Sequence, residues 1–248
     1  MTVLIAIPVG PNIPPDLLDK AIRHALAQTA DVVVLATGDG CKPAVGFTNS
    51  RLVTGSFPVN RGAPFTQQAM ILGSPFPWYA PHGADDWIEP DHVASLLALR
   101  APVNGSGRIF YHEPRRTQIF RSSRTYIEFG VLDTALLRAV GGYNAAEPCG
   151  QDSVLISVLV RTARYRLSAR PTYHKLHRED SLTHHPDTRG GSEIRTGVRL
   201  RNRAVLADLE RIGWRDRAAI RAYRDALVPE PLRAELEDRA ADVARWLT

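Results

Sequence analysis

The sequence contains few cysteines and no long apolar run. Cys41 and Cys149 are the only cysteines among 248 residues, and they stand far apart. A disulfide framework or a thiolate zinc site needs several cysteines at short spacings, so neither is predicted. No stretch approaches the roughly 18 apolar residues of a membrane span, and the N-terminus lacks the charged start of a signal peptide. We therefore expect a soluble cytoplasmic protein without membrane insertion.

Acidic residues are missing from one long segment of a chain that is basic overall. Between Ser153 and Arg178 there is no Asp or Glu. The basic residues of that segment are Arg161, Arg164, Arg166, Arg170, Lys175 and Arg178. The whole chain has a formal charge of +5. Positive surface attracts phosphate groups, so nucleotides, nucleic acids and lipid head groups are the candidate partners.

Strand and helix patterns alternate along the first half of the chain. Residues 2–9 and 30–40 are continuous apolar runs rich in β-branched residues, which is typical of strands covered on both faces of a parallel sheet. Between them, apolar residues at helical spacing predict a helix capped by Asp16. Further strands are predicted at 51–59 and 76–83, and further helices at 61–74, 90–100, 134–140 and 152–163. This alternation predicts an α/β fold with a mostly parallel sheet flanked by helices.

The second half of the chain is less regular. Residues 108–129 alternate as strands or hairpins do, whereas 173–193 have the composition of turns and are too polar for a core. From about Arg195 onward the chain is charged and helical. We predict a domain at 1–194, with a nucleotide-binding half at 1–100 and an acceptor-binding half at 101–194, followed by a C-terminal helical extension at 195–248.

Three loops follow predicted strands, at 8–12, 37–40 and 82–86. Ligands of open α/β sheets bind at the carboxyl ends of the strands, so these loops mark the expected site. The last of them contains Asp85 and Asp86, whose like charges repel unless a cation or a proton lies beside them. The pair is predicted to bind such a ligand, although two acids before Pro90 also suit the start of a helix.

Four motifs occur in a characteristic order. They are "IAIPVGPN", "TGDG", "NRGAPFTQQAMILGSPFPWYAPHGADDWIEPDHVASLL" and "FGVLDTALLRAVGGYNAAEPCGQDSVL". Together they resemble the signature of family 2 glycosyltransferases of the GT-A fold, over roughly residues 1–185. The resemblance implies transfer of a sugar, with inversion, from a nucleoside diphosphate sugar to an acceptor hydroxyl. A UDP-sugar is the favoured donor.

The resemblance also implies a divalent cation, Mn²⁺ or Mg²⁺, that neutralises the leaving diphosphate. Asp85 matches the final Asp of the family's metal-binding DxD motif, Asp86 follows it, and His177 is the third expected ligand, ahead of His174. Gly83 stands where the family has the first Asp. This departure weakens the expected metal site or shifts it onto Asp85 and a later His.

Asp152 matches the Asp of the family's Glu-Asp pair, and Gln151 replaces the Glu. The resemblance implies that Asp152 is the general base that deprotonates the acceptor hydroxyl. Asp152 also begins a predicted helix, where it can serve as a cap. The backbone N–H groups there are expected to lower its pKa, so that a base at this position relies on proximity.

The remaining site residues follow from the same motifs. Asp39 matches the acid that contacts the nucleotide base. The predicted donor-binding residues are Pro8, Val9, Asn12, Asp39, Asn60, Arg61, Asp85 and Arg178. The predicted acceptor-binding residues are Trp87, Tyr143 and Gln151. The acceptor itself is open, and the basic residues keep DNA with a hydroxylated base as one candidate.

Two other functions fit parts of the sequence. Its Asp and His residues suit a metal-dependent phosphoester hydrolase, but the short HxH or HExxH motifs of such enzymes are absent. Gly83 and Gln151, which replace two acids of the family pattern, suit a degenerate transferase fold that only binds a nucleotide or nucleic acid.

Overall fold

The computed structural model describes residues 1–112, 115–120, 127–150, 152–178 and 191–248. Its strands are β1 (Val3–Val9), β2 (Val32–Asp39), β3 (Leu52–Phe57), β4 (Trp78–Pro81), β5 (Trp87–Ile88), β6 (Val103–His112), β7 (Arg115–Phe120), β8 (Val131–Asp133) and β9 (Tyr165–His177). Its helices are α1 (Pro15–Leu26), α2 (Ala63–Gly73), α3 (His92–Leu97), α4 (Thr134–Ala139), α5 (Asp152–Thr162), α6 (Glu193–Ile212), α7 (Arg217–Ala226) and α8 (Glu230–Trp246). The strands form one sheet in the order β3-β2-β1-β4-β8-β6-β9-β5, and β7 pairs with β6.

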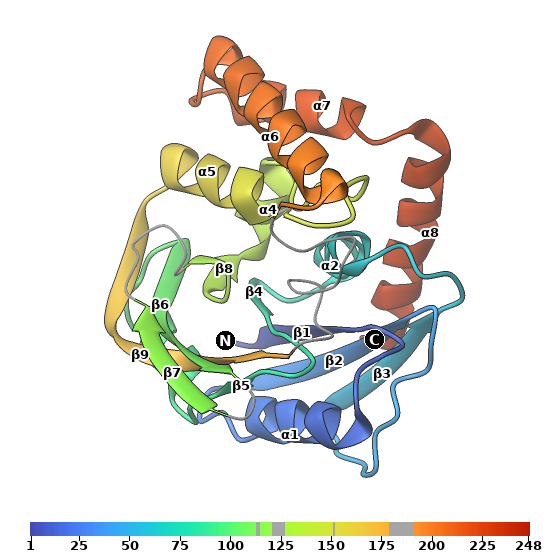
Figure 1. Cartoon of the computed structure of the whole chain (residues 1–248), viewed down its shortest axis with the longest axis vertical. Coiled ribbons are helices and arrows are strands. Elements are labelled where there is room, and N and C mark those ends of the chain that lie inside the picture. Colours follow the sequence, from blue (N-terminus) through green and yellow to red (C-terminus); the bar gives the residue numbers. More distant parts are fainter. Residues whose placement is uncertain (113–114, 121–126, 151, 179–190) are drawn as a thin grey trace.

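The central strand β1 is buried on both faces, as its continuous apolar sequence predicts. Val3, Ile5 and Ile7 point into one hydrophobic cluster with α1 and α3, whereas Leu4 and Ala6 point into a second cluster. Successive side chains of a strand point to opposite faces, so one apolar run supplies both cores. Figure 1 shows α1 below the sheet, with α2 and α8 above it.

The first half of the sheet is parallel. β1 pairs in parallel with β2 and with β4, and β2 pairs in parallel with β3. α1 begins at Pro15 after Pro14, and no side chain caps it. The prediction that Asp16 caps this helix is therefore wrong. Asp16 lies inside the first turn, because Pro15, with its fixed φ, already starts the helix.

The second half of the sheet is mixed. β8 is antiparallel to β4 and β6, whereas β6 and β9 are parallel. The prediction of turns from residue 173 is wrong up to His177, because β9 continues to that residue. Tyr173, only 1% exposed, lies where β9 pairs with both β6 and β5, so its polar neighbours in sequence do not prevent burial.

The C-terminal helices pack against the rest of the chain. Leu209, Ile220 and Val243, one from each of α6, α7 and α8, belong to the same hydrophobic cluster as Leu4. α8 lies along α2, and its Trp246 ring lies 5.5 Å from the Phe57 ring of β3. Figure 1 shows α6 and α7 beyond α4 and α5, on the side away from α1. Within the described ranges, every helix is too short or too polar to cross a membrane.

Candidate active site

A cleft of about 390 Å³ opens at the carboxyl ends of the parallel strands, and we call it the carboxyl-edge cleft. The loops after β1, β3 and β4 and the last residue of β2 line it, as expected for an α/β sheet. Of the predicted site residues, it is lined by Pro8, Val9, Asn12, Asp39, Asn60, Asp85, Asp86, Tyr143, Asp152, His177 and Arg178. Residues far apart in sequence therefore meet in one cleft.

Asp39 at the end of β2 organises the loop that begins α2. Its two carboxylate oxygens accept hydrogen bonds from the backbone N–H groups of Arg61, at 2.8 Å, and Gly62, at 2.6 Å. Asn60 also accepts from the Gly62 N–H through its side chain, at 3.0 Å. Burial raises the pKa of Asp39, and the two backbone N–H groups oppose that rise. Asp39 thus shapes the loop between β3 and α2 from within the protein.

Asp86 is turned inward. Its carboxylate accepts hydrogen bonds from the Tyr173 hydroxyl, at 2.7 Å, and from the Leu176 backbone N–H, at 2.9 Å, and the residue is 2% exposed. A Cβ atom added to Gly83 would lie 2.3 Å from Asp86 Oδ2. A side chain at position 83 would therefore collide with the Asp86 carboxylate, which fills that space. Asp86 joins the loop after β4 to β9.

Asp85 is the acid of the pair that meets a cation. Arg178 Nη1 lies 3.5 Å from Asp85 Oδ2, and Arg178 Nη2 donates to the Asn12 carbonyl at 3.2 Å. Burial and the negative charge of Asp86 raise the pKa of Asp85, whereas Lys175 and Arg178 oppose that rise. The Arg178 side chain thus connects the loops after β1 and β4, and the residue is only 5% exposed.

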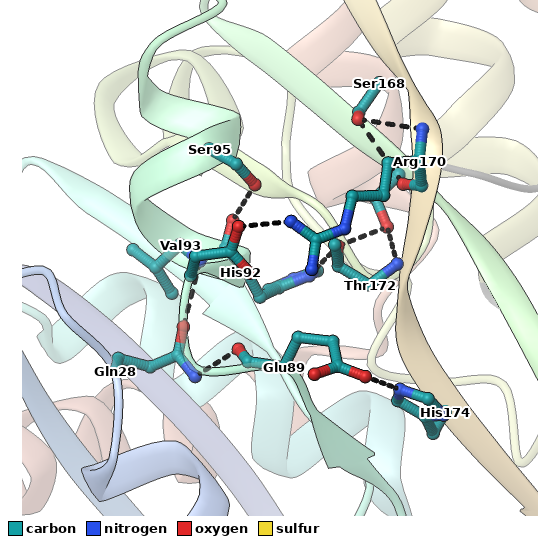
Figure 2. Close-up of polar contacts among 11 residues, drawn as sticks. Gln28, Glu89, His92, Val93, Ser95, Ser168, Arg170, Thr172 and His174 are labelled. Atoms are coloured by element: carbon teal, nitrogen blue, oxygen red, sulfur yellow. Dashed lines mark hydrogen bonds and ion pairs between the residues drawn. The ribbon is translucent and has the colours of Figure 1, made fainter.

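A polar network holds β9, the strand that carries Lys175 and His177, against α1 and α3 (Figure 2). Thr172 contacts His92 Nδ1 at 2.7 Å and donates to Ser106 at 2.9 Å. His174 Nε2 lies 2.7 Å from the Glu89 carboxylate, and the Glu89 carbonyl accepts from the Gln28 amide at 2.8 Å. These buried bonds fix the strand whose C-terminal end enters the cleft.

Asp152 lies at the N-terminus of α5 and lines the same cleft. Burial raises its pKa to about 6, and the negative charge of Glu128 adds to the rise. The expected lowering of this pKa by backbone N–H groups is wrong, because burial and Glu128 outweigh them. A carboxylate with a pKa near 6 is a better proton acceptor at neutral pH than an ordinary Asp.

Two of the predicted residues that the structure describes are not brought to the cleft. Arg61 turns away and forms an ion pair with Glu235 of α8, at 2.8 Å. The Trp87 ring stacks on His174 at 5.4 Å, and Lys20 of α1 covers it at 3.5 Å. Gln151 lies outside the described residues. Neither Arg61 nor Trp87 lines the cleft, so their predicted donor and acceptor roles gain no support from its geometry.

Two acidic or basic residues of the cleft were missed by sequence reasoning, Lys175 and Glu128. Lys175 lines it from β9, two residues before His177, so strand alternation over 173–177 marks it as facing the same way as His177. Glu128 also lines the cleft and pairs with buried Arg108 at 2.7 Å. No sequence signal marks Glu128, because its partner lies on β6, 20 residues earlier in the chain.

The cleft residues fit a divalent cation poorly. Within the described ranges, no three His, Cys, Asp or Glu side chains lie together as a metal site. The predicted ligand set of Asp85, Asp86 and His177 is therefore not assembled there. The physical reason is that both oxygens of Asp86 are engaged by Tyr173 and Leu176, and Asp85 faces Arg178.

No protein-family model and no curated protein sequence matches the chain. Solved structures, by contrast, do match the chain. TarS 1-349 of S. aureus in complex with UDP-GlcNAc superposes with a TM-score of 0.62 at 14% identity, over 99% of this chain and 74% of that one. The mannosyltransferase PcManGT of Pyrobaculum calidifontis, in complex with GDP-Man and Mn²⁺, superposes with a TM-score of 0.54 at 14% identity, over 98% and 85%. The chain has the GT-A glycosyltransferase fold.

The GT-A fold accounts for the mixed sheet and for a cleft at its carboxyl edge. TarS bound to UDP superposes over a similar extent, with a TM-score of 0.57 at 13% identity and coverage of 99% and 89%. The expected fold class is confirmed, including the helices at the C-terminus. At such low identity the likeness concerns the fold, so chemistry must be argued from the cleft.

Proposed function

We propose that the chain is a glycosyltransferase that moves a sugar, with inversion, from a nucleoside diphosphate sugar to an acceptor hydroxyl. The observation that carries the proposal is that Asp39, Asp85 and Asp152, from three separate motifs, line one cleft. The structural neighbours include complexes with UDP-GlcNAc and with GDP-Man, which supports a sugar nucleotide as ligand. UDP-sugars are the favoured donors.

In the proposed reaction, the nucleotide lies along the loops after β1 and β2, and the diphosphate lies beside Asp85 and Arg178. Asp152 accepts the proton of the acceptor hydroxyl while the hydroxyl oxygen forms a bond to the anomeric carbon. The bond from that carbon to the diphosphate oxygen breaks, and the nucleoside diphosphate leaves with the electron pair. A single displacement from the face opposite the leaving group inverts the anomeric carbon.

No step of this reaction is routed through the predicted Mn²⁺ or Mg²⁺, because the described residues of the cleft do not group as a ligand set for it. The same geometry disfavours a metal-dependent hydrolase, which requires a bound metal to activate water. A degenerate binding protein is disfavoured by the raised pKa of Asp152. An Asp that served only as a helix cap would gain nothing from burial beside the negative charge of Glu128.

The acceptor is proposed at the level of a hydroxyl group. DNA with a hydroxylated base remains one candidate, supported by exposed arginines on α5, β9 and α6, among them Arg161, Arg166, Arg199 and Arg203. Transfer assays with hydroxymethylated duplex DNA, the unmodified duplex and simple sugars would separate this candidate from the others. Transfer to the hydroxymethylated duplex alone would establish it.

The first test of the proposal is donor binding. A thermal-shift panel of UDP, GDP, CDP and dTDP, each free and as its glucose conjugate, is expected to raise the melting temperature with one base. At a ligand concentration of 100 times Kd, stabilisation of about 2.7 kcal/mol corresponds to a rise of roughly 5–10 °C for a chain of this size. A panel in which no nucleotide raises the melting temperature, with or without Mn²⁺, would overturn the proposed function.

A further inference from the structure

Residues 140–150, which lead from α4 towards α5 and which we call the 140–150 segment, contribute to the carboxyl-edge cleft. Gly141 and Gly142 at its start have φ angles of +83° and +55°, a backbone conformation that favours glycine. Tyr143 follows them, is 6% exposed and lines the cleft together with Asp152. Burial raises the pKa of Tyr143, and the negative charges of Glu128 and Asp152 add to the rise. A protonated phenol therefore lies near the proposed base.

Gln68 of α2 contacts the glycine turn twice. Its side-chain oxygen accepts a hydrogen bond from the Tyr143 backbone N–H at 2.7 Å, and its amide donates to the Gly141 carbonyl at 3.4 Å. A Cβ atom on Gly142 would collide with that oxygen, so a larger residue at this position would break the contact. α2 thus fixes the backbone that carries the Tyr143 side chain.

Arg224 of α7 contacts the same turn from the C-terminal part of the chain. Its guanidinium donates to the Val140 carbonyl at 2.6 Å and to the Gly142 carbonyl. The residue is 4% exposed, and burial lowers its pKa to about 10. Burial of a guanidinium is unfavourable, and an apolar side chain of similar volume would avoid that cost. Core packing alone therefore does not account for an arginine at this position.

Asn202 of α6 makes a comparable contact at the other end of the 140–150 segment. Its side-chain amide donates to the Gly150 carbonyl at 3.0 Å, and the residue is 7% exposed. The same carbonyl accepts from the Ser153 N–H at 3.4 Å, in the first turn of α5. Asp152 begins that turn. Side chains from α6 and α7 thus hold both ends of the segment that carries Tyr143 and leads to Asp152.

We propose that Arg224 and Asn202 are positioning residues for sugar transfer, because they hold Tyr143, as a contact of the acceptor, and Asp152, as its base, in the arrangement that the reaction needs. The inference rests on the proposed function, since it concerns the acceptor step of that reaction. Arg224 and Asn202 do not line the cleft themselves and act through the 140–150 segment. The C-terminal helices therefore take part in transfer as well as in the hydrophobic core.

The experiment measures release of the nucleoside diphosphate from the glucose conjugates of UDP, GDP, CDP and dTDP, with water and with hydroxymethylated duplex DNA as acceptors. Arg224→Met and Asn202→Ala should each lower kcat by about tenfold to a hundredfold, because a displacement of about 1 Å at the reacting groups has an effect of that size. Donor Kd, measured by calorimetry, should change by less than about twofold, because neither side chain lines the cleft.

Two comparisons separate positioning from a general loss of stability. Arg224→Lys keeps the positive charge and can donate to one of the two carbonyls, so it should recover part of the lost rate. Tyr143→Ala removes the side chain that Arg224 is proposed to position. In that background, Arg224→Met should lower kcat by a factor at least threefold smaller than in the unaltered chain, because the two residues act together.

Arg217→Met is the matched control. Arg217 also lies on α7 and donates to a backbone carbonyl, that of Thr162 at 2.7 Å, but its partner lies outside the 140–150 segment. It should leave kcat unchanged within about twofold. Circular dichroism checks that each variant folds, and if Arg224→Met does not, Arg224→Lys and Asn202→Ala decide the test.

Folded Arg224 and Asn202 variants that release the nucleotide as fast as Arg217→Met would overturn the inference while the proposed function stands. Full independence of the Arg224→Met and Tyr143→Ala effects would also overturn it, because Arg224 would then not act through the turn. If the unaltered chain releases no nucleotide from any of the four donors, the proposed function itself fails, and the inference fails with it.

Discussion

At the scale of single residues, the cleft contains four carboxylates in four different surroundings. Asp39 is occupied by backbone N–H groups, Asp86 by Tyr173 and the Leu176 N–H, and Asp85 by Arg178. The pKa of Asp152, by contrast, is raised by burial and by the negative charge of Glu128. A raised pKa suits a group that must accept a proton. Residues of one chemical type thus take structural and reactive roles according to what surrounds them.

Asp152→Asn should reduce sugar transfer by about 100-fold to 10,000-fold, the usual contribution of a general base. Donor affinity should change little, because Asp152 is proposed to act on the acceptor and not on the donor. The measurement is the initial rate of transfer, with the thermal shift caused by the nucleoside diphosphate as the control. Transfer at the unaltered rate with intact donor binding would contradict the assignment of Asp152 as the base.

The pH dependence of transfer should follow the pKa of Asp152. A base must be deprotonated, so activity should fall about tenfold per pH unit below a pH of about 6. Glu128→Gln removes a negative charge that raises this pKa, and the acidic limb should therefore move to lower pH. Glu147→Gln, which alters another Glu paired with an arginine, Arg201, is the control and should leave the limb in place. A limb that stays fixed in Glu128→Gln would mean that another group controls it.

At the scale of elements, β9 connects the two halves of the site. It pairs with β6 and β5, is held by the network of Thr172 and His174, and ends with His177 in the cleft. The Tyr173 hydroxyl contacts the loop after β4 twice, donating to Asp86 and accepting from the Gly83 N–H at 3.0 Å. The geometry of the acidic motif therefore depends on a strand that follows it by almost ninety residues.

Tyr173→Phe should lower the free energy of unfolding by about 1–3 kcal/mol, because a buried carboxylate and a buried N–H lose their partner. The measurement is urea unfolding monitored by fluorescence. Tyr165→Phe, at the exposed start of the same strand, is the matched control and should change stability by less than about 0.5 kcal/mol. Equal stability of both variants would show that the Tyr173 hydroxyl is not needed to hold the loop.

At the scale of the whole molecule, the C-terminal helices share a core with the sheet. A Cβ atom on Gly73 of α2 would lie 2.3 Å from the Ala240 carbonyl oxygen of α8, and one on Gly55 of β3 would lie 2.2 Å from the Trp246 ring. Two glycines thus permit the close approach of α8 to both elements. Because these contacts join the last helix to β3 and α2 in the first half of the chain, we expect α8 to unfold together with the sheet.

Trp246→Ala should lower the free energy of unfolding by about 2–4 kcal/mol, since it removes the ring that packs on Phe57. Unfolding should remain a single transition by circular dichroism and by fluorescence. Leu200→Ala, on an exposed face of α6, is the control with an expected change below about 0.5 kcal/mol. A second transition, or a cost as small as that of the control, would indicate that α8 folds independently of the sheet.

Much of this architecture is legible in the sequence. The apolar runs at 2–9 and 30–40 can only be strands covered on both faces, and the loops after them must meet at one edge of a parallel sheet. Asp133 caps α4 through a local hydrogen bond, because its side chain accepts from the Leu136 N–H at 2.8 Å. The short strand β5 and the last residues of β9 were not predicted, because their pairing partners are remote.

The sequence by itself determined the α/β layering and the edge of the sheet at which the cleft lies, because hydrophobic periodicity and the alternation of strands and helices are local properties of the chain. Its resemblance to known motifs, and not its periodicity, pointed to 11 of the residues that line the cleft. Only the tertiary structure decided which way each charged side chain turns. Arg61 turns to Glu235, Asp86 to Tyr173 and Arg178 to Asp85. Each of these choices depends on a partner far away in sequence, and the burial that raises the pKa of Asp152 likewise arises only when both halves of the chain close around the cleft.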